Sequence, residues 1–145
     1  MPATEEQRRI AEAVRDFAQT RLKPQSADWG RDGRFPAEAV REMAELGLLG
    51  MLVPGDWGGA ETGYVAYAMA LEEIAAGDGA CSTIVSVHNS VACLPILTFG
   101  TDAQRALFLR PLAAGDMLGA FALTEPQAGS DARNIRTTAR REGDG

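Results

Sequence analysis

The stretch FALTEPQAGSD, residues 121–131, marks the point where the chain changes from helical to strand periodicity. Apolar and small residues alternate over residues 117–123 with the period of a β-strand, and Pro126 ends the pattern. Beyond the proline, the backbone amides of residues 128–130 have no ladder partner, and their side chains are small enough for a flat ligand to approach. The pattern predicts a strand that leads into a loop for an anionic heterocycle or a pyrophosphate.

The residues before this stretch carry helical periodicity. Thr4 with Gln7, and Thr101 with Gln104, form capping boxes that start amphipathic patterns. We expect Pro24 to end the first helix and residues 25–34 to form a loop. Five helices are predicted in all, over residues 5–23, 36–47, 62–77, 79–101 and 101–115.

Two of these helices allow a prediction of which side chains face inward. In the third helix we expect the apolar residues to point into the core and Glu72 and Glu73 to point outward. The inward set is Tyr64, Tyr67, Ala68, Leu71, Ile74 and Ala75. Residues 79–101 contain no Asp, Glu, Lys or Arg, but their polar residues are spread along the segment, which argues against a membrane span. We interpret this segment as the buried central helix of a bundle.

Composition and charge exclude several classes of function. The net charge is −6 and basic residues are scattered, so a nucleic-acid interface is not expected. Cys81 and Cys93 lie about 18 Å apart along one helix, which predicts free, buried thiols. His88 is the single histidine, so no metal site is predicted, and we expect it to be a hydrogen-bonded core residue. The acidic N-terminus resembles no targeting peptide, which favours a cytoplasmic location.

A second strand is predicted over residues 135–141, followed by a hairpin turn at residues 142–145. The strand that would pair next is missing from the sequence. We therefore expect a truncated piece of a longer protein, with an all-helical domain over residues 1–115 and the beginning of a β domain over residues 116–145.

Residues 121–131 resemble the first signature of the acyl-CoA dehydrogenases, in which an apolar residue, Ser or Thr, and Glu precede a small-Gly-Ser/Thr-Asp turn. Arg133 and Asn134 depart from the family pattern just after it. The similarity also extends upstream through residues 46–54, 58–59, 70–74 and 86–90. Residues 67–74, together with residues 86–90, are most similar to short-chain, butyryl-type members.

The resemblance implies a mainly α fold, in which an N-terminal helical bundle is followed by the first strands of a β-barrel-like middle domain. It implies FAD as cofactor and α,β-dehydrogenation of acyl-CoA to trans-2-enoyl-CoA in fatty acid β-oxidation. It further implies that electrons leave to an electron-transferring flavoprotein, and that the full-length parent is a homotetramer. The 145-residue chain alone is expected to be inactive.

The family pattern assigns Phe121, Leu123, Thr124, Gly129 and Ser130 to cofactor binding, and Ser130 also to substrate binding. Donors at these positions would stabilise negative charge on a reduced flavin. Glu125 and Asp131 are expected to hold the loop through backbone hydrogen bonds. The family's catalytic glutamate lies beyond residue 145, so no catalytic residue is assigned here. An acyl-CoA oxidase-like flavoenzyme and an inactive helical interaction module remain as alternatives.

Overall fold

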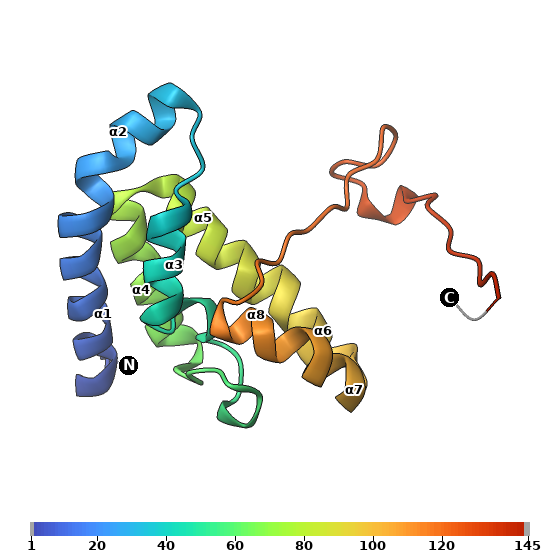
Figure 1. The fold of residues 1–145 in the computed structure, drawn as a ribbon, viewed down its shortest axis with the longest axis horizontal. Helices are drawn as coiled ribbons and strands as arrows, with labels where there is room; N and C mark the ends of the chain where they lie inside the picture. The colour runs from blue at the N-terminus through green and yellow to red at the C-terminus, as the bar shows by residue number, and fades with distance from the viewer. Residues whose placement is uncertain (1, 144–145) are drawn as a thin grey trace.

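The structure, a computed structural model, describes residues 2–143. Its helical body confirms the mainly α fold and holds five continuous helical segments within the described chain (Figure 1). The first segment consists of α1 (Glu5–Phe17), the π-helical turn η1 (Ala18–Leu22) and α2 (Lys23–Asp32). The next two are α3 (Ala37–Glu45) and α4 (Gly63–Gly77), and between them lie the 3₁₀ turns η2 (Leu48–Gly50) and η3 (Gly55–Trp57).

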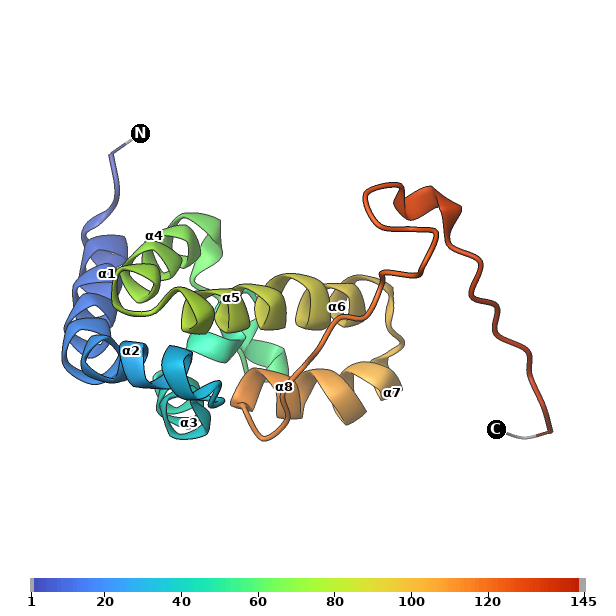
Figure 2. The ribbon, with the colours of Figure 1, turned by 90° about the horizontal axis from the view of Figure 1, so that it is seen from above.

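The fourth and fifth segments each contain a π-helical turn. The fourth consists of α5 (Gly79–Val87), η4 (His88–Cys93) and α6 (Leu94–Phe99). The fifth consists of α7 (Asp102–Gln104), η5 (Arg105–Leu109) and α8 (Arg110–Ala114). In the view of Figure 2, the fifth segment runs beside the fourth. Both predicted capping boxes are present, with the side chains of Thr4 and Thr101 accepting from the amides of Gln7 and Gln104.

The core lies where these segments cross. α1 packs along α4, α4 packs against α5, and α3 and α8 close the other side through η2. A large cluster of buried side chains joins α1, α3, α4 and α5. A smaller cluster joins η4 to α8 and to Val53. Cys81 and Cys93 are both buried and free, as predicted. Apolar burial of this kind is the main stabilising contribution to a bundle.

Pro24 does not end the first helix, and residues 25–34 are not a loop, because the chain stays helical to Asp32 and Gly33 then ends it with a φ of 60°. Each proline inside a helix, namely Pro24, Pro95 and Pro111, follows two residues after a π-helical turn. The residue before each one donates its amide five residues back instead of four. The wider turn accommodates a ring that has no N–H to donate.

The predicted helix faces are partly wrong. In α4, Tyr67 and Ile74 are buried as expected, but Tyr64 is 68% exposed, and Ala66 and Ala70 take buried positions instead. The helix Gly79–Phe99 is long and apolar enough to cross a membrane by length and composition, and only 28% of its most apolar stretch is buried. It is central in position, yet one of its faces is open.

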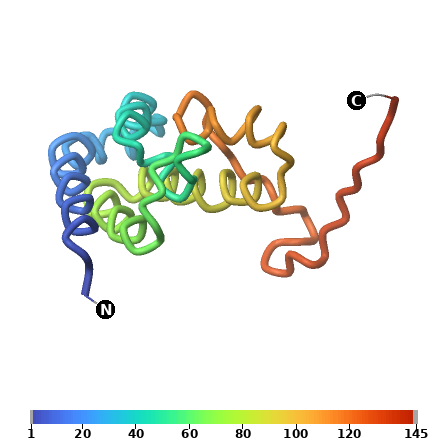
Figure 3. Tube along the Cα trace, turned by 90° about the horizontal axis from the view of Figure 1, so that it is seen from below, coloured from blue at the N-terminus to red at the C-terminus, as the bar shows by residue number. Residues whose placement is uncertain are grey.

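The two predicted strands do not form a ladder in the described part of the chain. Residues 115–121 pass along the fourth helical segment, and residues 122–143 then run away from the helical body as extended chain, interrupted by a tight turn and by the 3₁₀ turn η6 (Ala132–Asn134) (Figures 1 and 3). The one bridge among residues 2–143 joins Glu125 to Ala128. A strand needs a partner for its backbone groups, and the described residues supply none here. The predicted hairpin turn extends to Asp144 and Gly145, which lie outside the described residues.

Candidate functional site

The loop predicted to bind a cofactor is closed at its base by Glu125. The backbones of Glu125 and Ala128 exchange two hydrogen bonds of 3.1 Å, which form a tight turn through Pro126 and Gln127. Ala128 is buried, and its amide donates to the carbonyl of Glu125. The amide of Ala128 is therefore not free, contrary to the prediction for residues 128–130.

The Glu125 carboxylate also holds the returning chain. Its oxygens accept from the amides of Arg136 at 2.8 Å and Thr137 at 2.9 Å, and from the Thr137 hydroxyl and the Gln127 side-chain amide. These donors, led by the Thr137 hydroxyl, lower the pKa of Glu125 to about 2. A carboxylate with so many donors is a poor proton acceptor, which agrees with the structural role expected for Glu125 and argues against its acting as a base.

The far side of the loop is held by Asp131 and Asn134. The Asp131 carboxylate accepts from the amide of Arg133 at 3.3 Å and begins η6. The Asn134 side chain donates to the carbonyl of Gln127 at 3.0 Å, across the loop. Asn134 departs from the family pattern, and this bond gives it a function in closing the turn.

The candidate cofactor residues lie on the open side of this closed loop. Phe121 is 52% and Leu123 41% exposed, and Thr124, Gly129 and Ser130 are exposed as well. Within residues 2–143, the hydroxyls of Thr124 and Ser130 and the amides of Gly129 and Ser130 have no protein partner. The loop therefore presents fixed, unused donors and small side chains, which suits the polar edge of a flat heterocycle.

His88 connects the helical body to the segment that leads into this loop. It is 1% exposed; its Nε2 lies 2.9 Å from the carbonyl oxygen of Leu112, and its Nδ1 accepts from the amide of Gly119 at 3.1 Å. Burial lowers the pKa of His88, against the smaller opposing effect of the Leu112 carbonyl. The prediction of a hydrogen-bonded core histidine agrees with this geometry, but its partner on the loop segment was not foreseen.

An apolar groove of about 340 Å³ lies beside this connection. Thr83, Ile84 and Val87 form one wall on α5, and residues 118–121 form the other. Phe35, from the loop before α3, and His88 complete the lining. The groove is uncharged and ends at Phe121, so it can take a short apolar group next to the candidate cofactor loop.

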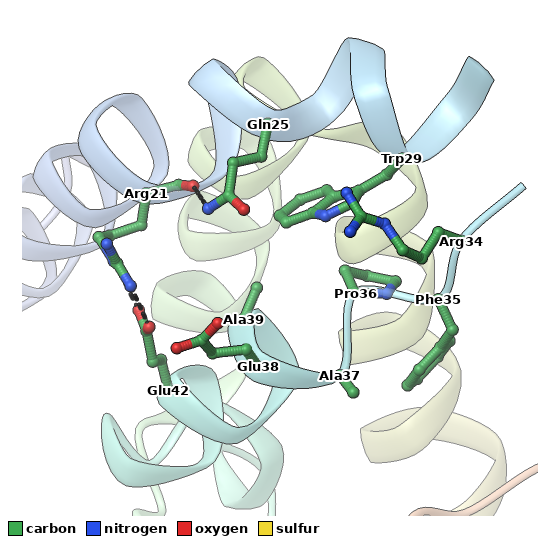
Figure 4. Close-up of a pocket in the computed structure, with 10 residues that line it drawn as sticks. All are labelled: Arg21, Gln25, Trp29, Arg34, Phe35, Pro36, Ala37, Glu38, Ala39 and Glu42. Atoms are coloured by element: carbon green, nitrogen blue, oxygen red, sulfur yellow. Dashed lines mark hydrogen bonds and ion pairs between the residues drawn. The ribbon is translucent and has the colours of Figure 1, made fainter. Parts of the chain in front are cut away.

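A second hollow, of about 180 Å³, lies between α2 and α3 and is more polar (Figure 4). Arg21 pairs there with Glu42, and Gln25 donates to the carbonyl of Arg21 at 3.1 Å. Phe35 lines both hollows, but none of the candidate cofactor residues lines the second. No cluster of three potential metal ligands occurs in the described part of the chain.

The chain matches the family model "Acyl-CoA dehydrogenase, N-terminal domain" over residues 4–116. It is 45% identical to the bovine (Bos taurus) mitochondrial short-chain specific acyl-CoA dehydrogenase over 93% of this chain and 33% of that protein. Thus it spans about a third of the length of such relatives.

Two solved structures show the same fold. A glutaryl-CoA dehydrogenase from Mycobacterium smegmatis in complex with FADH2 aligns with a TM-score of 0.91 and 41% identity, over 97% of this chain and 36% of that one. The butyryl-CoA dehydrogenase from Megasphaera elsdenii aligns with a TM-score of 0.87 and 34% identity, over 94% and 37%.

Proposed function

This chain belongs to the acyl-CoA dehydrogenase family, and from that premise we propose that it supplies the N-terminal helical part and the first cofactor loop of an FAD-dependent dehydrogenase of short-chain acyl-CoA. The observation that carries the proposal is the loop at residues 121–131. Its unused donors at Thr124, Gly129 and Ser130 face outward, while Glu125 and Asp131 hold its shape. The bovine relative's name supports the short-chain assignment.

FAD fits these residues because they offer hydroxyl and amide donors without bulky side chains. When bound, FAD supplies the acceptor for the hydride that leaves the β-carbon of the thioester, while the α-proton goes to a base. We assign Thr124 and the backbone at Leu123 and Gly129 to the pyrimidine end of the cofactor, where negative charge develops on reduction. Phe121 would lie beside it, and Ser130 would face the cofactor or the pantetheine of the substrate.

The apolar groove supports the choice of substrate. Its volume of about 340 Å³ and its uncharged walls suit a short acyl chain, and Phe121 places its end next to the cofactor loop. Because Glu125 is engaged by four donors, we assign the base to a glutamate outside these residues.

The remaining parts of the proposal follow from the family. We place residues 1–115 in the helical domain and residues 116–145 at the start of a β domain that pairs with further strands of the parent. The parent is proposed to be a cytoplasmic homotetramer of fatty acid β-oxidation, without a membrane span, that passes electrons to an electron-transferring flavoprotein.

The test is Thr124→Val in the full-length enzyme that carries this chain. Valine keeps the shape but removes the donor, and losing such a bond is expected to slow flavin reduction by on the order of tenfold. Thr138→Val is the matched control, because Thr138 is exposed and lies outside the loop. Stopped-flow absorbance with butyryl-CoA measures the rate of flavin reduction in both variants. Equal rates for the two variants and the wild type, with an intact flavin spectrum, would refute the assignment.

A further inference from the structure

His88 is held in one neutral form by its two partners. The Gly119 amide can only donate, so Nδ1 must be unprotonated, and the hydrogen on Nε2 then points to the Leu112 carbonyl. The ring is only 1% exposed, so both bonds lie in a largely solvent-shielded position. His88, on the fourth helical segment, thus links Leu112 in α8 to Gly119 in the segment that follows α8.

Gly119 lies unusually close to the same helix. A Cβ on this residue would come within 2.3 Å of the Ala92 Cβ and 3.4 Å of the Leu112 Cδ2. Real atoms do not approach so closely, so only glycine permits the contact at this position. The backbone of the segment before the loop therefore rests directly on η4, one turn after His88.

This contact is the last attachment before the cofactor loop. The amide of Met117 donates to the carbonyl of Pro111 at 3.1 Å, and His88 then receives the amide of Gly119. Between Gly119 and Glu125, the described chain makes no further backbone hydrogen bond to the helical body. Phe121 follows only two residues after the attachment, and His88 lines the groove that ends at Phe121.

We propose that His88 is a positioning residue, which sets the place of the cofactor loop and of the adjacent groove wall by holding the backbone at Gly119 against η4. The role rests on the proposed function, since it concerns how that loop meets FAD. A loop that begins two residues after such an attachment shifts when the attachment is lost, and small displacements of donors at a reacting group have large effects on rate.

Two substitutions separate the two bonds of His88. In His88→Asn the shorter side chain places its amide oxygen where Nδ1 lies. This variant can still accept the hydrogen bond from the Gly119 amide, but it loses the bond to the Leu112 carbonyl. In His88→Gln the longer side chain reaches the position of Nε2, so this variant keeps the bond to the Leu112 carbonyl and loses the bond from the Gly119 amide. We expect His88→Gln to slow flavin reduction by butyryl-CoA at least tenfold in the full-length holoenzyme, and His88→Asn, which keeps the acceptor for Gly119, to slow it several-fold less than His88→Gln does.

Cys93→Ala is the matched control for stability. Cys93 is buried on the same π-helical turn, within the cluster that joins η4 to α8, and makes no hydrogen bond to residues 116–123. It should lower the melting temperature while the rate of flavin reduction stays within about twofold. A purely structural role for His88 predicts that rate losses in all three variants follow their melting temperatures, and that result would overturn the proposal.

The contact can also be tested from the Gly119 side. Gly119→Ala should push the segment away from Ala92 and slow flavin reduction as His88→Gln does. Ala92→Gly removes the opposing Cβ, so the double variant Gly119→Ala/Ala92→Gly should recover most of the rate even though a helical glycine lowers stability. A double variant as slow as Gly119→Ala would contradict the close-contact explanation.

A measurement without activity completes the test. In the ¹⁵N-labelled 145-residue chain, the imidazole shifts of His88 should show an unprotonated Nδ1 and a protonated Nε2, with a scalar coupling from the Gly119 amide to Nδ1. The opposite tautomer would overturn this proposal and leave the proposed function standing. Wild-type holoenzyme that fails to oxidise butyryl-CoA, with the coupling present, would refute the proposed function and with it the role of His88 in flavin reduction.

Discussion

Asn89 is a buried polar side chain that joins two parts of the helical body through three hydrogen bonds. It is fully buried next to His88, its Oδ1 accepts from the amide of Leu52 at 3.2 Å, and its Nδ2 donates to the carbonyls of Leu48 at 2.9 Å and Val85 at 3.0 Å. It thereby fastens the chain around η2 to the fourth helical segment. Asn89→Leu keeps the number and branching of the side-chain heavy atoms but removes all three bonds.

The expected cost follows from the groups left behind. The amide of Leu52 loses its acceptor, which costs about 1–3 kcal/mol, and the Leu48 carbonyl loses a donor, which adds about 1 kcal/mol. The Val85 carbonyl keeps the amide of His88 as a donor, so it adds little. The free energy of unfolding should therefore fall by about 2–4 kcal/mol, out of the roughly 5–15 kcal/mol typical of a domain.

Urea denaturation followed by circular dichroism measures this loss. Ser90→Ala is the matched control, because the Ser90 hydroxyl bonds only to the carbonyl of Ser86 on its own helix, at 2.6 Å. The control should change the free energy of unfolding by less than about 0.5 kcal/mol. An Asn89→Leu variant as stable as the control would refute the reasoning that these bonds fasten η2 to the helix.

Two further predictions concern titratable groups. Burial raises the pKa of Cys81 and of Cys93 to about 12. Both thiols should therefore resist Ellman's reagent at pH 8 in the native chain and react with it in guanidinium. Rapid labelling of either thiol in the native chain would show that it is exposed. The pKa of Glu125 is lowered from 4.5 to about 2, so its bonds should stabilise the loop fully above about pH 4.5 and be lost as the pH falls through about 2. Carboxyl ¹³C shifts of Glu125 measure that midpoint, and a midpoint near 4.5 would show that the loop is not held by this carboxylate.

Local signals in the sequence were sufficient to predict much of the helical body. The capping boxes at Thr4 and Thr101 specify helix starts through residues three apart, so no knowledge of the fold is needed. The role of Glu125 was also predictable, because the proline after it leaves amides nearby that need an acceptor.

Other features depend on residues far apart in sequence. Pro24 normally ends a helix, and nothing local to it indicates the π-helical turn that lets the helix continue. α4 is apolar around most of its circumference, so periodicity could not show that Tyr64 points outward. The bond between His88 and Gly119 spans 31 residues. Its available signal was Gly119 itself, since a glycine inside a strand pattern indicates a close backbone approach.

The central claim is that the loop at residues 121–131 faces FAD, and hydrogen–deuterium exchange of the full-length enzyme tests it most directly. The amides of Gly129 and Ser130 have no acceptor within residues 2–143, so they should exchange rapidly in the apoenzyme and become protected when FAD is added. The helix Gly63–Gly77, which carries none of the proposed cofactor residues, should exchange equally in both forms. Among the peptides from this chain, protection confined to those that contain residues 121–131 is the predicted result, and exchange of these peptides that FAD leaves unchanged would contradict the account.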